Sequence, residues 1–393
     1  MCGRPPAQVH WASQAFAREA FFLNPVDSTK ERRMASMSCV ARRACLPVLL
    51  GWSLLPLALP ATAVSPPARP RIAFVSHAPD SDTWWTTIRN AIQQASEDFG
   101  VDVDYLNPHD GSIQEMGRIL NGLSTQRYAG VITTLADARG LAPALHQVVG
   151  IGHMPLITVN SGTGEQSKQA GAMLHIGQPE FQAGLEAGQR AAKEGVRSFV
   201  CLNHYASSAA SHERCQGFAQ GLGLPVSATA ELELSGNAAE MQQRIVQYQV
   251  ANPQVQAWLA LGPTSAHPAI AVIRAMKSGA NAPRRPYFVS FDVSQEIVGG
   301  IKDGVVAFAI DQQPYAQGYL SVALMGEYLR QGAPASGLGL VKYTVYAQPR
   351  LHARMSKYGI ELKPSNGRDI NSGPGFVTRA NVEKVERFSG QYR

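Results

Sequence analysis

Apolar runs alternate with amphipathic segments along the chain from about residue 71 onward. A β-branched run at 71–76 predicts a strand, and five apolar residues then recur at steps of three or four. This spacing predicts one face of a helix that ends at Gly100, because glycine is favoured just after a helix. The five residues are Trp85, Ile88, Ile92, Ala95 and Phe99.

The same alternation continues to about residue 331. It predicts strands at 101–106, 130–135, 155–160, 198–203, 230–234, 255–261, 287–291 and 305–310. Helices are expected near 113–123, 139–149, 210–222, 237–251, 265–279, 294–302 and 315–331. Alternating strands and helices form right-handed βαβ units with parallel sheets covered on both faces. Because one core rarely extends beyond about 250–300 residues, we expect an α/β protein of two doubly wound lobes.

The first 63 residues differ from the rest and predict a leader. A basic stretch at 41–43, an apolar run at 46–59 and an Ala-x-Ala site at 61–63 are typical of a secretory signal peptide cleaved near Ala63. The apolar run is shorter than the about 20 residues of a spanning helix. Met34 and Met37 precede the basic stretch, so we expect translation to start at one of them; the alternative is a true N-terminal extension.

Charge and cysteine usage agree with export. Residues 1–63 contain seven Lys/Arg and three acids, which is +4 of the net +6, so little basic excess remains to attract nucleic acid. Beyond residue 63 the chain has two cysteines, Cys201 and Cys215. Two cysteines in an oxidising compartment can form a disulfide, so a bond between this pair is a hypothesis that the sequence leaves open.

Polar side chains follow the predicted strands. Because sites in parallel sheets lie at the carboxyl ends of strands, the residues just after each apolar run are candidates. They are short donors and acceptors suited to hydroxyl groups: Asp82, Asp137, Asn160, Ser161, Asp292 and Gln312. Trp84 and Trp85 directly follow the first loop, and aromatic faces stack on the CH faces of a sugar ring.

Several segments together resemble the ribose-type periplasmic sugar-binding proteins, type I solute-binding proteins of ABC importers, over residues 71–345. These segments are 72–76 with 82–85, 212–218, 290–292 and 309–315. The resemblance implies that Arg214 reaches ligand hydroxyls, that Asp292 binds the sugar and that Gln312 contacts ligand from the hinge. Asn160 stands where the family usually has an aspartate, Ser161 where it has an arginine, and Gly262-Pro263 where it often has Asn-Asp.

The resemblance also implies a three-segment hinge. We expect crossings near 176–178, near Gln312 and near Val345. The N-terminal lobe would then comprise 71–176 plus 313–344, and the C-terminal lobe 177–312. The tail, 345–393, would pack on the lobes or the hinge.

Simpler roles compete with these assignments. Asp82 can cap the helix that begins near Thr83, contact ligand, or do both. Trp85 opens the apolar stripe, and a residue in this position more often belongs to the core, which leaves Trp84 as the better stacking residue. Arg214 can be a surface arginine. The histidines show no His-x₃-His or His-Glu-x-x-His spacing, so we expect no metal site.

The resulting hypothesis is a binding protein. The sequence has no Gly-x-Gly-x-x-Gly, Gly-x₄-Gly-Lys or Gly-x-Ser-x-Gly motif, and we expect neither enzyme activity nor a cofactor. We expect a monomer that clamps a small polar ligand, a sugar or polyol, and delivers it to an ABC permease in the inner membrane. The alternative is a periplasmic sensor that presents the ligand to a chemoreceptor or sensor kinase.

Overall fold

The computed structural model describes residues 68–393, apart from 207, 277–283, 333–337 and 363–366. The expected signal peptide, its cleavage site near Ala63 and the starts at Met34 or Met37 lie outside these residues. Within the described ranges, no helix is both long and apolar enough to cross a membrane.

The N-terminal lobe is built on a six-stranded parallel sheet in the order β11-β5-β4-β3-β1-β2. Successive side chains of a strand point to opposite faces. Accordingly, Ile72 and Phe74 of β1 belong to one core cluster, and Ala73 and Val75 belong to another. The strands are β1 (Arg71–Val75), β2 (Asp102–Leu106), β3 (Gly130–Thr133), β4 (Leu156–Val159), β5 (Leu174–Gly177) and β11 (Ile370–Asn371).

The C-terminal lobe repeats this plan with the order β12-β10-β9-β8-β6-β7. Its strands are parallel except β12, which runs antiparallel to β10. They are β6 (Phe199–Asn203), β7 (Glu231–Glu233), β8 (Ala257–Ala260), β9 (Tyr287–Phe291), β10 (Phe308–Asp311) and β12 (Gly375–Val377). The two doubly wound α/β lobes expected from the alternation are therefore confirmed.

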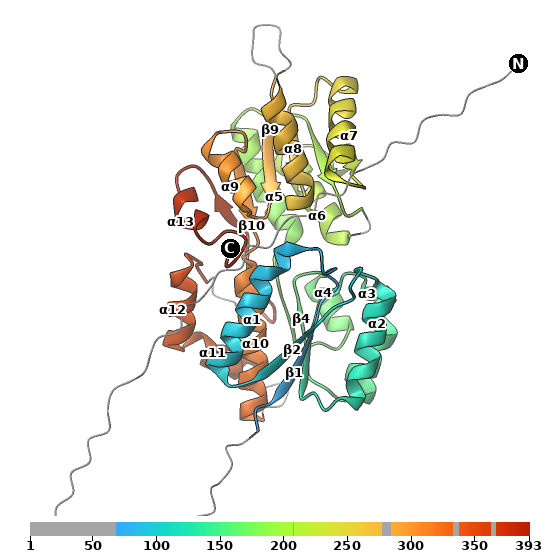
Figure 1. Cartoon of the computed structure of the whole chain (residues 1–393), viewed down its shortest axis with the longest axis vertical. Coiled ribbons are helices and arrows are strands. Elements are labelled where there is room, and N and C mark those ends of the chain that lie inside the picture. Colours follow the sequence, from blue (N-terminus) through green and yellow to red (C-terminus); the bar gives the residue numbers. More distant parts are fainter. Residues whose placement is uncertain (1–67, 207, 277–283, 333–337, 363–366) are drawn as a thin grey trace, which may run out of the picture. The chain divides into compact units, whose positions relative to one another are not determined.

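Helices cover both faces of each sheet (Figure 1). In the N-terminal lobe these are α1 (Thr86–Phe99) and α10 (Pro314–Gln331) on one face, and α2 (Ile113–Gly122) and α3 (Ala138–His146) on the other. In the C-terminal lobe α5 (Glu180–Lys193) and α6 (Ala209–Gly221) cover one face. The other face packs against α7 (Ala238–Ala251), α8 (Pro263–Ala275) and α9 (Gln295–Lys302). The short α4 (Gly164–Gln169) precedes β5.

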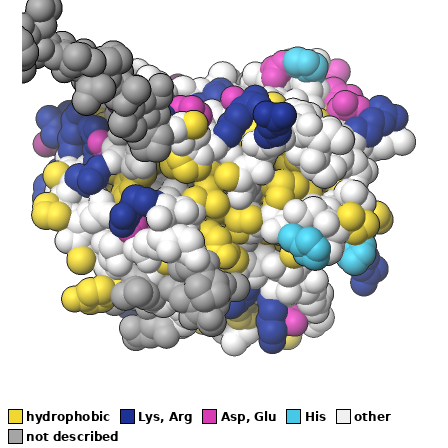
Figure 2. Space-filling view, turned by 90° about the horizontal axis from the view of Figure 1, so that it is seen from below, with side chains coloured by type: hydrophobic (Ala, Val, Ile, Leu, Met, Phe, Trp, Pro, Cys, Tyr) yellow, Lys and Arg dark blue, Asp and Glu magenta, His cyan; other side chains and the backbone are white. Residues whose placement is uncertain are grey.

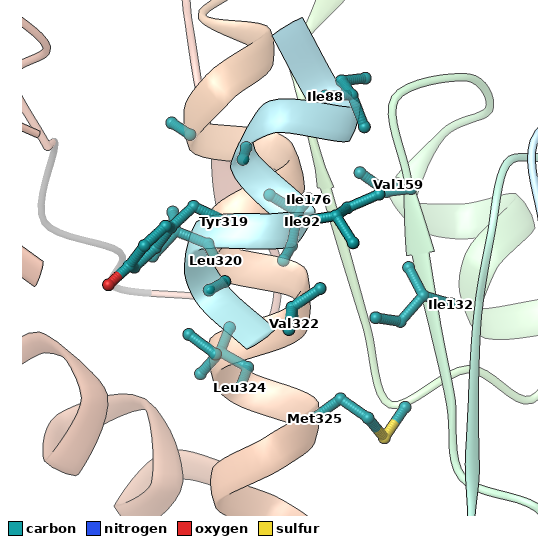
Figure 3. Packing of buried hydrophobic residues seen from close by; sticks show 14 of the residues in the cluster. Ile88, Ile92, Ile132, Val159, Ile176, Tyr319, Leu320, Val322, Leu324 and Met325 are labelled. Atoms are coloured by element: carbon teal, nitrogen blue, oxygen red, sulfur yellow. The ribbon is translucent and has the colours of Figure 1, made fainter. Parts of the chain in front are cut away.

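Figure 3 shows how α1 and α10 pack on the first sheet. Ile88 and Ile92 of α1 lie beside apolar residues of α10, and both helices face side chains from the strands. The close approach of the two helices depends on Gly318, where a Cβ would lie 3.0 Å from the Ala91 Cβ and from the Ile88 carbonyl oxygen. The labelled partners are Ile132, Val159, Ile176, Tyr319, Leu320, Val322, Leu324 and Met325.

Over the described residues, the chain passes between the two sheets three times. It leaves the first sheet after β5 and returns to the N-terminal lobe after β10, where α10 begins. The third crossing lies between β11 and β12, at 372–374, and the prediction of a crossing near Val345 was wrong. Val341, Val345, Leu351 and Met355 complete the core of the N-terminal lobe, so the chain stays there until β11 is formed.

The segment 345–393 is therefore divided between the lobes. Its first part contains α12 (Pro349–Lys357), which follows α11 (Leu338–Tyr346), and β11; these belong to the N-terminal lobe. Its second part contains β12 and α13 (Val382–Glu386), which packs with α9 in the C-terminal lobe. A strand of two residues in a Gly- and Pro-rich stretch has too little periodicity to be recognised from sequence.

The surface seen from below is shown in Figure 2. Lys and Arg side chains lie near Asp and Glu side chains around its edge, and apolar side chains lie between them. On the part of this face that the structure describes, both signs of charge are therefore interspersed. This mixed pattern differs from the continuous positive surface that is typical of nucleic-acid-binding proteins.

Candidate functional site

A cavity of about 730 Å³ lies at the carboxyl ends of the strands and is lined by residues of both lobes. The N-terminal lobe contributes the loops after β1, β2 and β4, and the C-terminal lobe contributes those after β6, β8 and β9 together with residues of α5 and α6. Gln312, between β10 and α10, and Gly390 near the end of the chain also line the cavity. The structure brings eight of the nine predicted ligand-binding residues to this cavity: Asp82, Trp84, Trp85, Asn160, Ser161, Arg214, Asp292 and Gln312.

Asp137 is the exception, and its assignment to the cavity is corrected. Its side chain is exposed and does not line the cavity. Its Oδ1 accepts hydrogen bonds from the backbone N–H groups of Arg139 (3.1 Å) and Gly140 (2.9 Å) and so caps α3. The carboxylate thus satisfies two N–H groups that otherwise lack a partner in the first turn of the helix.

The loop after β1 combines capping with cavity lining. Asp82 Oδ1 accepts a hydrogen bond of 3.1 Å from the Trp84 N–H and caps the 3₁₀-helix η1 (Thr83–Trp85). Asp82 is partly buried, and the resulting desolvation raises the pKa of its carboxyl. The two indole rings lie edge to face, with centroids 5.3 Å apart. Trp85 belongs to the core, whereas Trp84 is only partly buried, which leaves more of its surface available to a ligand.

A hydrogen-bonded relay connects the two lobes through the hinge. Asn160 Nδ2 donates to Gln312 Oε1 (3.3 Å), and Gln312 Nε2 donates to Asp292 Oδ1 (2.5 Å). Asn160 follows β4 of the N-terminal lobe and Asp292 follows β9 of the C-terminal lobe. Both have positive φ values, 64° and 65°, in the left-handed region that Asn and Asp tolerate better than most residues.

Arg214 lines the cavity but has a protein partner that the sequence did not reveal. Its Nε and Nη2 donate to the two carboxylate oxygens of Glu180 at 2.7 and 2.8 Å, and its Nη1 donates to the Leu261 carbonyl oxygen at 2.8 Å. The guanidinium also lies over the Phe291 ring, 4.4 Å from its centroid. Both members of the ion pair are buried. Three of the five guanidinium N–H groups are used in this way, which leaves two for a ligand.

Tight packing between α5 and α6 brings Glu180 and Arg214 together. A Cβ at Gly184 would overlap the Arg214 carbonyl oxygen, and a Cβ at Gly217 would overlap the Phe181 carbonyl oxygen. The two backbones are therefore in direct contact, which only glycine allows at these positions. Glu180 begins α5 and Arg214 lies in the first half of α6, so this contact sets the position of the pair on the cavity wall.

The electrostatics of Asp292 follow from its burial. Its residue is 5% exposed, and desolvation raises the pKa of its carboxyl to about 7, although Arg214 and Gln312 act in the opposite direction. Near neutral pH this carboxyl can therefore change its charge when its surroundings change.

Histidines also line the cavity, although the sequence predicted no role for them in ligand binding. A hydrogen bond of 3.0 Å joins His77 Nδ1 and Thr134 Oγ1. The His77 ring lies nearly parallel to the ring of Tyr205 of the other lobe, with ring centroids 6.3 Å apart. His204 has a buried Nδ1 without a hydrogen-bond partner among the described residues. Burial lowers the pKa of both histidines to about 4, so both are neutral at pH 7. A Cβ at Gly262 would lie 2.8 Å from His204 Cε1, so the glycine provides the space for this ring.

A disulfide lies beside the ion pair. It joins Cys201 of β6 to Cys215 of α6, whose Cα atoms are 6.2 Å apart, and both residues are fully buried. It therefore attaches the helix that carries Arg214 to the second sheet. Among the described residues, no cluster of three His, Cys, Asp or Glu side chains could hold a metal ion.

Solved structures of other proteins share this fold. A carbohydrate transporter from Acidothermus cellulolyticus, in complex with myo-inositol, is 24% identical, with a TM-score of 0.68, and the match covers 83% of this chain and 100% of that one. A periplasmic sugar-binding protein from Legionella pneumophila is 20% identical (TM-score 0.60; 67% and 97% covered). A glucose-galactose binding protein from Geobacillus stearothermophilus is 16% identical (TM-score 0.61; 80% and 99% covered).

Residues 72–333 match the family model described as a periplasmic binding protein domain. The match confirms the resemblance expected from the sequence. It also agrees with the observed type I architecture of two parallel-sheet α/β lobes. The family is one of solute-binding proteins and not of enzymes. This chain therefore belongs to the periplasmic binding protein domain family.

Proposed function

We propose that this protein is an exported solute-binding protein that captures a sugar or polyol in the described cavity and delivers it to an ABC import permease. One observation carries the proposal. Polar side chains from the two lobes, Asn160 and Asp292, line one cavity and are hydrogen-bonded to the same hinge residue, Gln312. A ligand with several hydroxyl groups can bind both lobes at once and thereby act on the hinge.

The chemistry of the lining suits a hydroxylated ring. Asp82 and Asp292 offer acceptors, Ser161 offers both a donor and an acceptor, and Arg214 has donors that its protein partners do not use. The partly exposed Trp84 offers an aromatic face to the CH groups of the ring. A buried hydrogen bond contributes about 0.5–1.5 kcal/mol net, so several together reach the about −8 kcal/mol of micromolar binding.

Proteins of the same fold support the ligand class. The Acidothermus protein was solved with myo-inositol, and solute-binding proteins from Burkholderia graminis and Actinobacillus succinogenes were solved with D-arabinose and D-allose. A cyclitol, a pentose and a hexose are all small rings rich in hydroxyl groups. We therefore propose a ligand of this class for the present cavity and assign no particular sugar or cyclitol to it.

Ligand binding is tested by thermal unfolding of residues 64–393 with a panel of sugars, polyols and inositols. A ligand of the folded state raises the melting temperature as its concentration rises, and we expect this for at least one polyol. Trp84→Ala should reduce the shift. Tyr343→Ala, at an exposed position on α11, should leave it unchanged. A rise with amino acids or nucleotides only, and with no polyol, would contradict the proposed ligand class.

Delivery needs a separate test, because a sensor would bind ligand in the same way. The permease and ATPase encoded nearest to this gene are reconstituted in vesicles. We expect the ligand-loaded protein to stimulate ATP hydrolysis more than the ligand-free protein does. Equal hydrolysis in the two states would reject delivery to that permease and favour presentation to a chemoreceptor or sensor kinase.

A further inference from the structure

The charges on the cavity wall are unbalanced. Among the described residues that line it, four are carboxylates and one is a cation. The cation is Arg214, and the carboxylates are Asp82, Asp110, Glu180 and Asp292.

The single cation is already neutralised. Arg214 forms two parallel hydrogen bonds with Glu180, at 2.7 and 2.8 Å, and both side chains are buried. Such a bidentate pair has no net charge and holds the guanidinium in a fixed plane. Two N–H groups of Arg214 remain for a ligand, but the positive charge of the guanidinium is already balanced by Glu180, so a ligand carboxylate or phosphate meets no net positive charge there. The pair therefore provides no strong anion site.

The other three carboxylates have no such partner. Asp82, Asp110 and Asp292 form no ion pair with a Lys, Arg or His side chain among the described residues. Asp82 and Asp292 come from different lobes, and both are removed from water at least in part. The lining histidines His77 and His204 are neutral near pH 7 because burial lowers their pKa. Burial raises the pKa of Asp292 to about 7, so this carboxyl is partly protonated at pH 7, and a cation bound beside it would favour its charged form. The carboxyl groups of the wall therefore outnumber its cations and favour a positively charged guest.

With the proposed function as premise, we propose that the cavity selects its polyol by charge: an amino sugar or aminocyclitol binds more tightly than the matching neutral polyol, and carboxylated or phosphorylated polyols are excluded. An ammonium group donates up to three charge-assisted hydrogen bonds, which are stronger than those of a hydroxyl group. It also attracts partly desolvated carboxylates and the face of an indole such as that of Trp84. An anionic group meets the carboxyl groups of Asp82 and Asp292 on the two lobes instead.

The test compares matched ligands that differ in one group. Calorimetric titration at pH 7 uses glucose with glucosamine and glucuronate, galactose with galactosamine and galacturonate, and myo-inositol with an aminodeoxyinositol and inositol monophosphate. For the ring that binds, we expect the amine to bind about tenfold more tightly than the neutral form. The acid or phosphate should bind at least about tenfold more weakly.

Variants assign the preference to the cavity carboxylates. Asp82→Asn and Asp292→Asn should each reduce the ratio between amine and neutral affinities severalfold. The matched control is Asp102→Asn, an exposed aspartate at the start of β2, the end of the strand away from the cavity, where the ratio should stay the same.

The outcomes separate the two proposals. If neutral polyols bind and their amines bind equally or more weakly, charge selection is rejected while the proposed function stands. The same rejection follows if an anionic form binds as tightly as its neutral form, or if both cavity variants keep the wild-type ratio. If no polyol of any charge binds, the proposed function itself is rejected, and charge selection with it.

Discussion

The side-chain amide of Gln312 donates a hydrogen bond of 2.5 Å to the Asp292 carboxylate. The same amide accepts a hydrogen bond from Asn160 of the other lobe. Gln312 is also held from behind, because Gln317 Nε2 and Ser372 Oγ both donate to its backbone carbonyl oxygen, at 3.1 and 2.7 Å. The second and third crossings thus meet at one residue that touches both halves of the cavity, so a ligand that engages Asn160 or Asp292 changes the bonding of the hinge.

This relay predicts that Gln312→Met weakens ligand binding. Methionine has a similar length but cannot donate to Asp292 or accept from Asn160, so both partners lose a hydrogen bond inside the cavity. Each lost bond costs about 1–3 kcal/mol when the partner stays buried, so we expect the dissociation constant measured by calorimetry to rise at least about tenfold. The control is Gln243→Met, at an exposed position on α7, which should bind as the wild type does. Unchanged affinity of Gln312→Met would show that the relay does not contribute to binding.

The Glu180–Arg214 pair predicts a large loss of stability for Glu180→Gln. The substitution keeps the shape but leaves a buried guanidinium without its counter-charge, which typically costs about 3–5 kcal/mol. Urea unfolding would measure this loss. Glu115→Gln is the matched control, because Glu115 also pairs with an arginine, Arg118, at 2.7 Å, but on the surface. Its loss should stay within about 1 kcal/mol. Equal losses for the two variants would mean that the buried pair is not a significant source of stability.

The pair also shows which parts of the site could be predicted from the sequence. Strand ends were readable because apolar runs stop at polar residues, and this placed Asp82, Asn160 and Asp292 at one edge. The partner of Arg214 was not readable, because Glu180 lies 34 residues earlier and meets it only through the packing of two helices. The glycines that permit this packing carry no mark that distinguishes them from other helical glycines.

For Asp137 the sequence predicted a place on the cavity wall that the structure does not give it. An aspartate after a strand looks the same in sequence whether it faces a ligand or caps the next helix. Asp82 caps η1 and also lines the cavity, whereas Asp137 caps α3 and does not line the cavity. Which role an aspartate takes depends on whether its loop faces the cavity. The direction of the loop is set by tertiary packing, which the local sequence does not show.

The close contact of α5 and α6 predicts that Gly217→Ala destabilises the protein. Its new methyl group would overlap the Phe181 carbonyl oxygen, a backbone atom that cannot move without shifting the helix. Overpacking of this kind costs about 1–3 kcal/mol or more, and we expect ligand affinity to fall as Arg214 moves. Gly117→Ala, in α2 with no atom near the new methyl group, should instead gain about 0.5–1 kcal/mol. Urea unfolding of the two variants checks this, and a neutral Gly217→Ala would contradict the described helix contact.

The disulfide predicts a redox-dependent stability. Replacing both Cys201 and Cys215 by alanine should lower the free energy of unfolding by about 3 kcal/mol, the loop-closure contribution for a loop of roughly 15 residues. Reducing agent should destabilise the wild type by a similar amount and leave the double variant unchanged. Thiol titration of the unfolded, unreduced chain 64–393 should find no free thiol. Two reactive thiols would show that the cysteines are not bonded in the mature protein.

Asp292 predicts how stability depends on pH. Its pKa is about 7 in the folded protein, above the ordinary value of 3.8, because the buried carboxyl is desolvated. Between these two values the folded state holds the proton more tightly than the unfolded state does. The contribution of Asp292 to the free energy of unfolding is therefore greatest below about pH 4 and falls as the pH rises to 7, by at most about 1.4 kcal/mol per pH unit.

Comparison with Asp292→Asn isolates this contribution, because asparagine keeps the shape, tolerates the positive φ and does not titrate. We expect the free energy of unfolding of the wild type, measured in urea from pH 4.5 to 7.5, to fall relative to that of the variant as the pH rises. Asp102→Asn, at an exposed position, should follow the wild-type curve. If the wild type and Asp292→Asn instead give parallel curves, Asp292 titrates at its ordinary pKa. Its carboxylate would then be charged throughout this range and would meet the ligand as a fixed anion.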